Sequence, residues 1–166
     1  MFNRILVPTD FSPPSDAALE YARILAAKFG SSLQLLHVID EPNASSAFVA
    51  DGFAPNTENI REGMLMQARE RLARALPLTH RARFHVTSEA LVGMPAATIV
   101  DYAAATGANL IVMGTHGRTG LAHLLMGSVA EHVVRTAPCP VLTVRQVTVA
   151  EEAIATATGY CVPIPA

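Results

Sequence analysis

The sequence predicts an α/β protein with a five-stranded, mainly parallel sheet and helices on both faces. Short apolar runs, typical of strands buried on both sides, alternate along the chain with segments whose apolar residues recur at helical spacing. Strands joined by helical crossovers run parallel, with right-handed connections. With 166 residues and 51% hydrophobic content, the chain is expected to bury one core.

Five segments have the composition of strands. The first is continuously apolar and stops at Pro8, whereas the third alternates apolar and polar side chains, as a half-exposed edge strand does. The expected strands are 5–7, 33–39, 84–91, 110–113 and 141–144.

Local signals place the helices between these strands. Ser12 can cap a helix with Pro13 at its first position, and Gly30 stands where a left-handed residue would end it, which predicts a helix over 13–29. The other expected helices run from Thr57 to Pro77, from Pro95 to Gly107 and over 130–135. The long connection 40–55 is typical of a mobile flap, and an inert loop is an equally good interpretation.

Composition excludes several classes of protein. A formal charge of −2 and a pI near 6.3 provide no basic field for nucleic acid. Cys139 and Cys161 have no CxxC spacing, so we expect neither a disulfide framework nor a zinc site. The opening segment turns into a strand too soon for a signal peptide, and no apolar run approaches the roughly 20 residues that span a bilayer. We therefore expect a cytoplasmic protein with no membrane partner.

The stretch 114–129 follows the fourth strand and carries Gly114, Gly117, Gly127 and Ser128. Glycines let a backbone adopt positive φ and approach a ligand closely, and the first turn of the helix that follows offers unpaired N–H groups to an anion. Such a loop between a strand and a helix is typical of phosphate binding.

A carboxylate is expected beside this loop. Ligands bind parallel sheets outside the carboxyl ends of the strands, where neighbouring connections diverge. If the first strand is central, flanked by the second and fourth, Pro8, Thr9 and Asp10 come to lie beside Met113 and Gly114. The glycine loop and Asp10 would then line one cleft.

Other nucleotide sites fit the sequence less well. A P-loop needs a lysine after its glycines, but the only lysine is Lys28, in the first helix. A dinucleotide site would place glycines after the first strand, where Asp10 and Phe11 stand. The His-x-Gly-His signature of adenylyltransferases is absent, since Arg118 occupies its last position.

The sequence assigns less specific roles to Arg118 and to the histidines. Arg118 could neutralise phosphate charge or simply be solvated, and both remain open. His116 and His123 are expected to be polar surface residues, while His37 and His85, which alternate with apolar neighbours on strands, are expected to be structural.

Four motifs, in order, make the chain similar to the universal stress protein family over residues 2–145. These motifs are Leu6-Val7-Pro8-Thr9-Asp10-Phe11-Ser12, Leu36-His37-Val38-Ile39, Gly114-x2-Gly117-x9-Gly127-Ser128 and Pro138-Cys139-Pro140-Val141. The resemblance implies a Rossmann-like fold of the adenine nucleotide alpha hydrolase type, with strand order 3-2-1-4-5 and a homodimer paired through the fifth strand, Val141–Val144. It also implies a domain over 1–146, followed by a C-terminal extension over 147–166.

One branch of that family binds ATP and carries this glycine pattern, so the resemblance points to the ATP-binding branch. It implies that the triphosphate meets Gly114, Gly117, Gly127 and Ser128, with Val129 adjacent, and that Asp10 approaches the ribose. Pro8, Thr9, Val38 and Met113 would frame the adenine. Each residue also has a purely structural explanation: Gly114 ending a strand, Ser128 capping a helix, Asp10 stabilising a turn and Val38 filling the core.

Function then divides into three hypotheses. The first is an ATP-binding regulatory module of the stress response, in which occupancy changes the 40–55 connection or the dimer and so the choice of an unknown protein partner. The second is a slow ATPase or phosphotransferase using the same cleft, although no convincing base pairs with Asp10 or Ser128. The third is a dimeric scaffold that binds no nucleotide. The sequence leaves metal dependence open, including any role for Mg²⁺.

Overall fold

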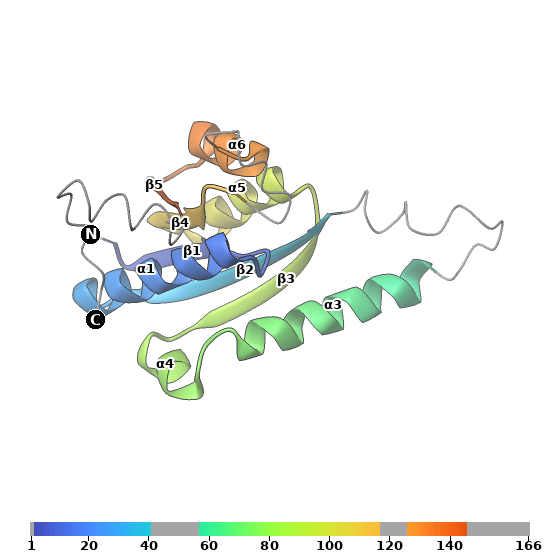
Figure 1. Cartoon of the computed structure of the whole chain (residues 1–166), viewed down its shortest axis with the longest axis horizontal. Coiled ribbons are helices and arrows are strands. Elements are labelled where there is room, and N and C mark those ends of the chain that lie inside the picture. Colours follow the sequence, from blue (N-terminus) through green and yellow to red (C-terminus); the bar gives the residue numbers. More distant parts are fainter. Residues whose placement is uncertain (1, 41–56, 117–125, 146–166) are drawn as a thin grey trace, which may run out of the picture.

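A computed structural model describes residues 2–40, 57–116 and 126–145 of the chain (Figure 1). The 40–55 connection beyond Asp40, the residues Gly117, Arg118 and His123, and the extension 147–166 lie outside this description.

The five predicted strands form one parallel sheet in the order β3-β2-β1-β4-β5 (Figure 1). The strands are β1 (Arg4–Pro8), β2 (Ser32–Asp40), β3 (Thr87–Gly93), β4 (Leu110–Gly114) and β5 (Val141–Val144). The central position of β1 brings the carboxyl ends of β1 and β4 side by side. Fold class and strand order are as predicted.

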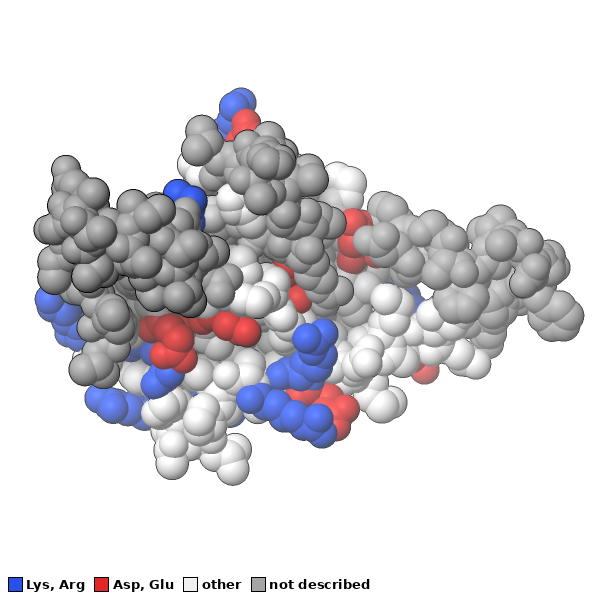
Figure 2. All heavy atoms as spheres, viewed as in Figure 1, with Lys and Arg blue, Asp and Glu red and all other residues white. Residues whose placement is uncertain are grey.

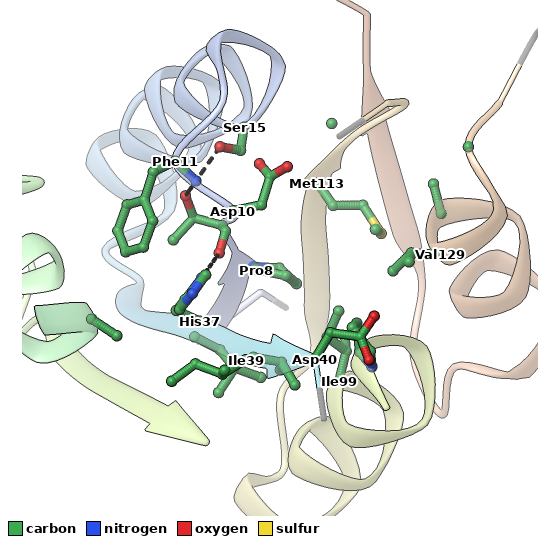
Figure 3. Close-up of a pocket in the computed structure, with 18 of the residues that line it drawn as sticks. Pro8, Asp10, Phe11, Ser15, His37, Ile39, Asp40, Ile99, Met113 and Val129 are labelled. Carbon is green, nitrogen blue, oxygen red and sulfur yellow. Dashed lines mark hydrogen bonds between the residues drawn. The ribbon is translucent and has the colours of Figure 1, made fainter. Parts of the chain in front are cut away.

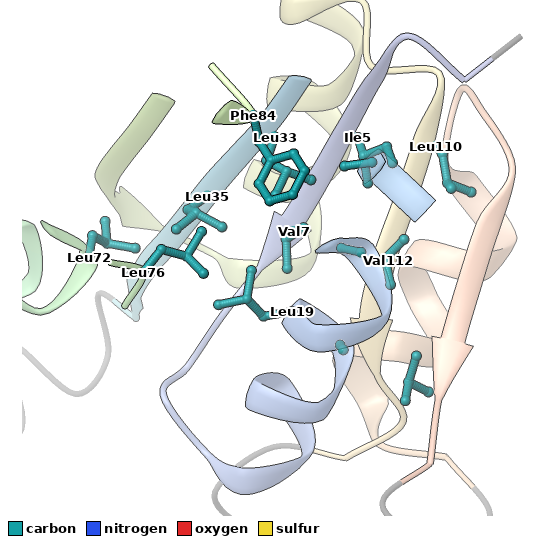
Figure 4. Close-up of a cluster of buried hydrophobic side chains, with 14 of the residues drawn as sticks. Ile5, Val7, Leu19, Leu33, Leu35, Leu72, Leu76, Phe84, Leu110 and Val112 are labelled. Carbon is teal, nitrogen blue, oxygen red and sulfur yellow. The ribbon is translucent and has the colours of Figure 1, made fainter. Parts of the chain in front are cut away.

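Helices cover the two faces of the sheet. They are α1 (Pro13–Phe29), α3 (Thr57–Arg74), α4 (Leu78–Arg83), α5 (Pro95–Thr106) and α6 (Ser128–Thr136). On one face, α1 and α3 pack on alternate strand residues such as Val7 and Leu35 (Figure 4). On the other, α5 and α6 pack on residues such as Leu6 and Ile111. The apolar runs are explained by this double burial.

Local capping sets the bounds of α1 and α5. Ser12 is the N-cap residue of α1, and its N–H donates to the Ser15 hydroxyl over 3.0 Å. Gly30 and Gly107 end α1 and α5 with φ of 67° and 65°, the left-handed conformation that glycine adopts without a steric penalty. The bounds predicted for the first helix are confirmed.

The segment before β3 differs from the prediction of a strand over 84–91. Phe84 instead ends the short helix α4, which the sequence pattern does not predict, and β3 begins at Thr87. Between them His85 has φ of 45°, which interrupts an extended conformation. The alternation still indicates burial correctly, since Phe84 and Ala90 are buried, because the chain here packs on the core before it joins the sheet.

Positive and negative side chains are mixed on the surface rather than gathered into separate patches. On the face shown in Figure 2, the lysine and arginine side chains of the described residues are interspersed with aspartates and glutamates. Three arginines pair with a glutamate one turn earlier on their own helix: Arg23 with Glu20, Arg74 with Glu70 and Arg135 with Glu131. Across the three described ranges, no helix is both long and apolar enough to cross a membrane.

Candidate functional site

A cavity of about 440 Å³ lies at the carboxyl ends of β1, β2 and β4, where the first turns of α1 and α6 begin (Figure 3). All predicted site residues that the structure describes line it. These are Pro8, Thr9, Asp10, Val38, Met113, Gly114, Gly127, Ser128 and Val129. The topology therefore brings together residues more than a hundred positions apart, whereas the predicted Gly117 and Arg118 lie outside the description.

The cavity continues across the end of the sheet from one face to the other. Val38, Met113 and Val129 belong with the core under α5 and α6. Phe11 and Met64 belong with the core under α1 and α3, and they line the same cavity. The sequence prediction thus covers mainly the α5 and α6 side.

Hydrogen bonds hold the loop after β1 in one shape. Asp10 accepts at Oδ1 from the Ser12 N–H over 3.1 Å and from the Ser12 hydroxyl over 2.5 Å. Thr9 Oγ1 accepts from the Phe11 N–H over 3.0 Å and lies 3.0 Å from Ser15 Oγ. A turn-stabilising role for Asp10 is therefore real, and it also fixes the carboxylate at the cavity.

Phe11 has an unusual backbone, with φ of 61°. The left-handed region disfavours a side chain with a Cβ by roughly 1–2 kcal/mol. Contacts of the ring oppose this strain: its centroid lies 4.5 Å from that of His37, and the guanidinium carbon of Arg71 lies over it at 4.0 Å. Such strain persists where the surroundings over-determine it, which is common at binding sites.

His37 has the structural role that the sequence predicts, but it also lines the cavity. Its Nδ1 lies 2.7 Å from the carbonyl oxygen of Thr9 (Figure 3). Because a carbonyl only accepts, Nδ1 carries the proton of this bond. Sequence reasoning misses this lining position, although the placement of His37 at the end of a strand is a usable signal.

Two glycines serve close packing rather than positive φ. A Cβ placed on Gly114 would lie 3.0 Å from the carbonyl oxygen of Pro14, in the first turn of α1. A Cβ on Gly127 would lie 3.3 Å from the Thr115 carbonyl oxygen, and Gly127 has φ of −72°. The positive φ expected of loop glycines is therefore not found at Gly114 or Gly127, where neighbouring backbone crowds the space that a Cβ would occupy.

The first turn of α6 faces this cavity. Gly127 is its N-cap residue, and the first bond within the helix runs from the Glu131 N–H to the Gly127 carbonyl over 2.9 Å. The N–H groups of Ser128, Val129 and Ala130 therefore have no partner within the helix, and all three residues line the cavity. A helix start in this arrangement favours an anion.

Several further lining residues are not predicted by the sequence. They come from the end of β2, from α3, from the start of α5 and from the segment after β4: Ile39, Asp40, Met64, Gln67, Ala68, Arg71, Pro95, Ile99, Thr115 and His116. The α3 residues follow ordinary helical spacing, so no local signal distinguishes them from a helix that only packs.

Comparisons with known proteins identify the family and agree with the fold. The model of the universal stress protein family matches residues 1–145. Universal stress protein MJ0531 of Methanocaldococcus jannaschii is 36% identical over 146 residues, which cover 88% of this chain and 84% of that protein. The solved structure of MJ0577 from the same organism has a TM-score of 0.71 at 30% identity and covers 89% of this chain and 99% of that one.

A further solved structure is that of a universal stress protein in complex with cAMP. It has a TM-score of 0.55 at 26% identity, with 87% of this chain and 97% of that one covered. The matches to these three relatives cover 87–89% of this chain. The chain belongs to the universal stress protein family.

Proposed function

We propose that this protein binds ATP in the cavity and acts as a nucleotide-dependent regulatory module. The observation that carries the proposal is the gathering of the predicted, described site residues around one cavity at the carboxyl ends of the strands. A relative with the same fold was solved in complex with cAMP, which is also an adenine nucleotide. A cavity of about 440 Å³ lies within the size range of small-molecule sites.

The end of β2 supports a place for the base. Backbone groups of β2 point alternately to its two neighbours: Leu33 donates to Phe84 on the β3 side, and Leu36 accepts from Thr9 on the β1 side. By this alternation Val38 presents its N–H and C=O on the β1 side, beyond Pro8, where the paired register of β1 ends. Such a donor and acceptor match the amino group and ring nitrogen of adenine.

The opposite end of the cavity supports a place for phosphates. The N–H groups of the first α6 turn and the Ser128 hydroxyl supply donors, and the helix dipole adds partial positive charge. Asp10 also lines the cavity, and its carboxylate can accept hydrogen bonds from ribose hydroxyls, as acidic residues do in other nucleotide folds.

The carboxylates at the site bear on Mg²⁺ binding and on the hydrolysis of ATP. Asp10 and Asp40 both line the cavity, and their carboxylate oxygens are ligands of the kind that Mg²⁺ prefers. The Oδ1 atom of Asp10 already accepts two hydrogen bonds from Ser12, which suits a positioning role better than that of a base. We therefore propose that ATP acts mainly as a signal of cellular state.

Calorimetric titration with ATP, ADP, AMP and GTP, with and without Mg²⁺, tests the proposal. Asp10→Asn should weaken ATP binding by roughly ten- to hundredfold, the scale of a lost hydrogen bond to a charged group. The matched control is Asp16→Asn, since Asp16 is exposed on α1 and does not line the cavity. No saturable nucleotide binding by the wild type, or equal losses in both variants, would refute nucleotide recognition here.

Steady-state phosphate release separates signalling from hydrolysis. The regulatory proposal predicts release close to background under saturating ATP and Mg²⁺. Release well above background, abolished by Asp10→Ala while ATP binding is retained, would instead establish an ATPase or phosphotransferase.

A further inference from the structure

The α3 side of the cavity is not used by the positions proposed for the base, the ribose and the phosphates. Met64, Gln67, Ala68 and Arg71 line it from successive turns of α3, at the spacing of one helical face. The proposed base and phosphate positions use residues of the strand ends and of α6 instead. This compartment therefore offers contacts that the proposed nucleotide positions leave unused.

Arg71 is held at this compartment by an aromatic contact. Its guanidinium carbon lies over the Phe11 ring, 4.0 Å from the centroid, and the His37 ring lies 4.5 Å from the same ring. Phe11 has the left-handed φ of 61°, and its ring lies against Arg71 of α3. A guanidinium on the face of an aromatic ring keeps its N–H donors at its edge, where they suit a carboxylate or phosphate.

The charge of Arg71 is not compensated on its own helix. Unlike the three helical arginines paired with glutamate, Arg71 forms no ion pair within residues 2–40, 57–116 and 126–145. The positions one turn before and after it hold no carboxylate, being Gln67, Ala68, Arg74 and Ala75. Its cation is therefore available to a ligand.

The cavity needs such a cation if its ligand is anionic. Asp10 and Asp40 line it and repel negative charge, and among the lining residues that the structure describes Arg71 is the one lysine or arginine. The helix start of α6 supplies only partial charge.

We infer that Arg71, stacked on Phe11, forms an anion-binding subsite on the α3 side of the cavity, which takes a phosphate or carboxylate group. The inference rests on the proposed function in sharing its cavity. The anion has two sources: the phosphate tail of the nucleotide itself, or a separate small anion bound beside the nucleoside.

Calorimetry with adenosine, AMP, ATP and inorganic phosphate tests the subsite. Arg71→Gln removes the charge and keeps a polar side chain of similar reach, whereas Arg71→Lys keeps the charge and removes the planar fork. Arg69→Gln is the matched control, because Arg69 is exposed on the same helix and does not line the cavity.

Arg71→Gln should weaken AMP and ATP binding by roughly three- to fivefold, the scale of a partly exposed charge pair, and leave adenosine unchanged. Arg71→Lys should recover part of the loss, and Arg69→Gln should match the wild type. Binding of inorganic phosphate to the adenosine-bound protein, lost in Arg71→Gln, would identify a separate anion. No such binding, with the ATP effect intact, would identify the nucleotide tail.

Two results would overturn the subsite. One is an equal loss for adenosine and ATP in Arg71→Gln, which would mean that Arg71 only shapes the cavity. The other is unchanged binding of AMP, ATP and phosphate. If the wild type binds no nucleotide, the proposed function fails, and Arg71-dependent binding of inorganic phosphate alone still decides the subsite.

Discussion

Gly114 packs directly against the backbone of Pro14, so that a Cβ on Gly114 would lie 3.0 Å from both the carbonyl carbon and the carbonyl oxygen of that proline. This contact joins the end of β4 to the first turn of α1, next to the cavity that Gly114 lines. The first glycine of the family-like loop therefore supports the site by packing.

Gly114→Ala should destabilise the protein by about 1–3 kcal/mol, since neither the β4 backbone nor the α1 backbone can move without disturbing the core. Urea unfolding measures the loss. Gly63→Ala is the matched control, because Gly63 lies in α3, where an added Cβ would meet nothing within 4 Å, and the change should stabilise by roughly 0.5–1 kcal/mol. Wild-type stability in Gly114→Ala would contradict the packing explanation.

At Phe11, a glycine variant should be more stable than an alanine variant, which reverses the usual order of stability. Both substitutions lose the ring contacts with His37 and Arg71, but only glycine relieves the left-handed φ of 61°. We expect Phe11→Gly to be more stable than Phe11→Ala by about 0.5–1 kcal/mol, from denaturant midpoints. At Arg69, in the helix α3, the alanine variant should instead be the more stable of the pair. The same order at both positions would mean that strain at Phe11 is negligible.

The edge strand β5 should form the interface of a homodimer. β5 ends the sheet, and Leu142 on it and Val134 on α6 are 38% and 45% exposed. A charge on an edge strand opposes pairing with another chain, so Leu142→Glu should convert a dimer to a monomer. Light scattering after size-exclusion chromatography measures the mass, with Leu78→Glu on α4, where Leu78 is 83% exposed, as the control. A monomeric wild type at micromolar concentration would rule out this interface.

Cys139 should react slowly with alkylating reagents. Burial raises the pKa of its thiol, and because the thiolate is the nucleophile, less of it is present near neutral pH than for an exposed cysteine. A Cys161→Ser variant isolates the signal of Cys139. Its alkylation rate should rise at higher pH in the folded protein than in urea, and coincident pH profiles would contradict the effect of burial.

Interactions between residues close together in the sequence explain which parts of the fold can be predicted. The bounds of α1 follow from Ser12, Pro13 and Gly30, all within a few residues of the helix ends. The helix α4 escapes prediction because Pro77 resembles a helix end, although it precedes a helix as its N-cap residue. Phe84 alternates with its neighbours as a strand residue would, yet its burial comes from packing under the sheet.

The candidate site, too, can be predicted from the sequence only in part. The pattern of residues at strand ends is enough to anticipate that Asp10 and Gly114 line one cleft, because parallel strands place their carboxyl ends at one edge, whereas Val38 is anticipated only through the family resemblance. The spacing of Gly114 is visible in the sequence, but its partner Pro14 is not, since two segments a hundred residues apart come together only when α1 packs on the sheet.

The amino-acid order alone thus accounts for the class of fold, the succession of its strands and of all its described helices but α4, and the strand-end half of the cavity, because propensity, capping and periodicity act over short distances along the chain. The contribution of α3, with Arg71 placed over Phe11, depends on the three-dimensional packing. An amphipathic helix is compatible with many positions on a sheet, and only close packing of its apolar face selects which of its polar residues reaches the site.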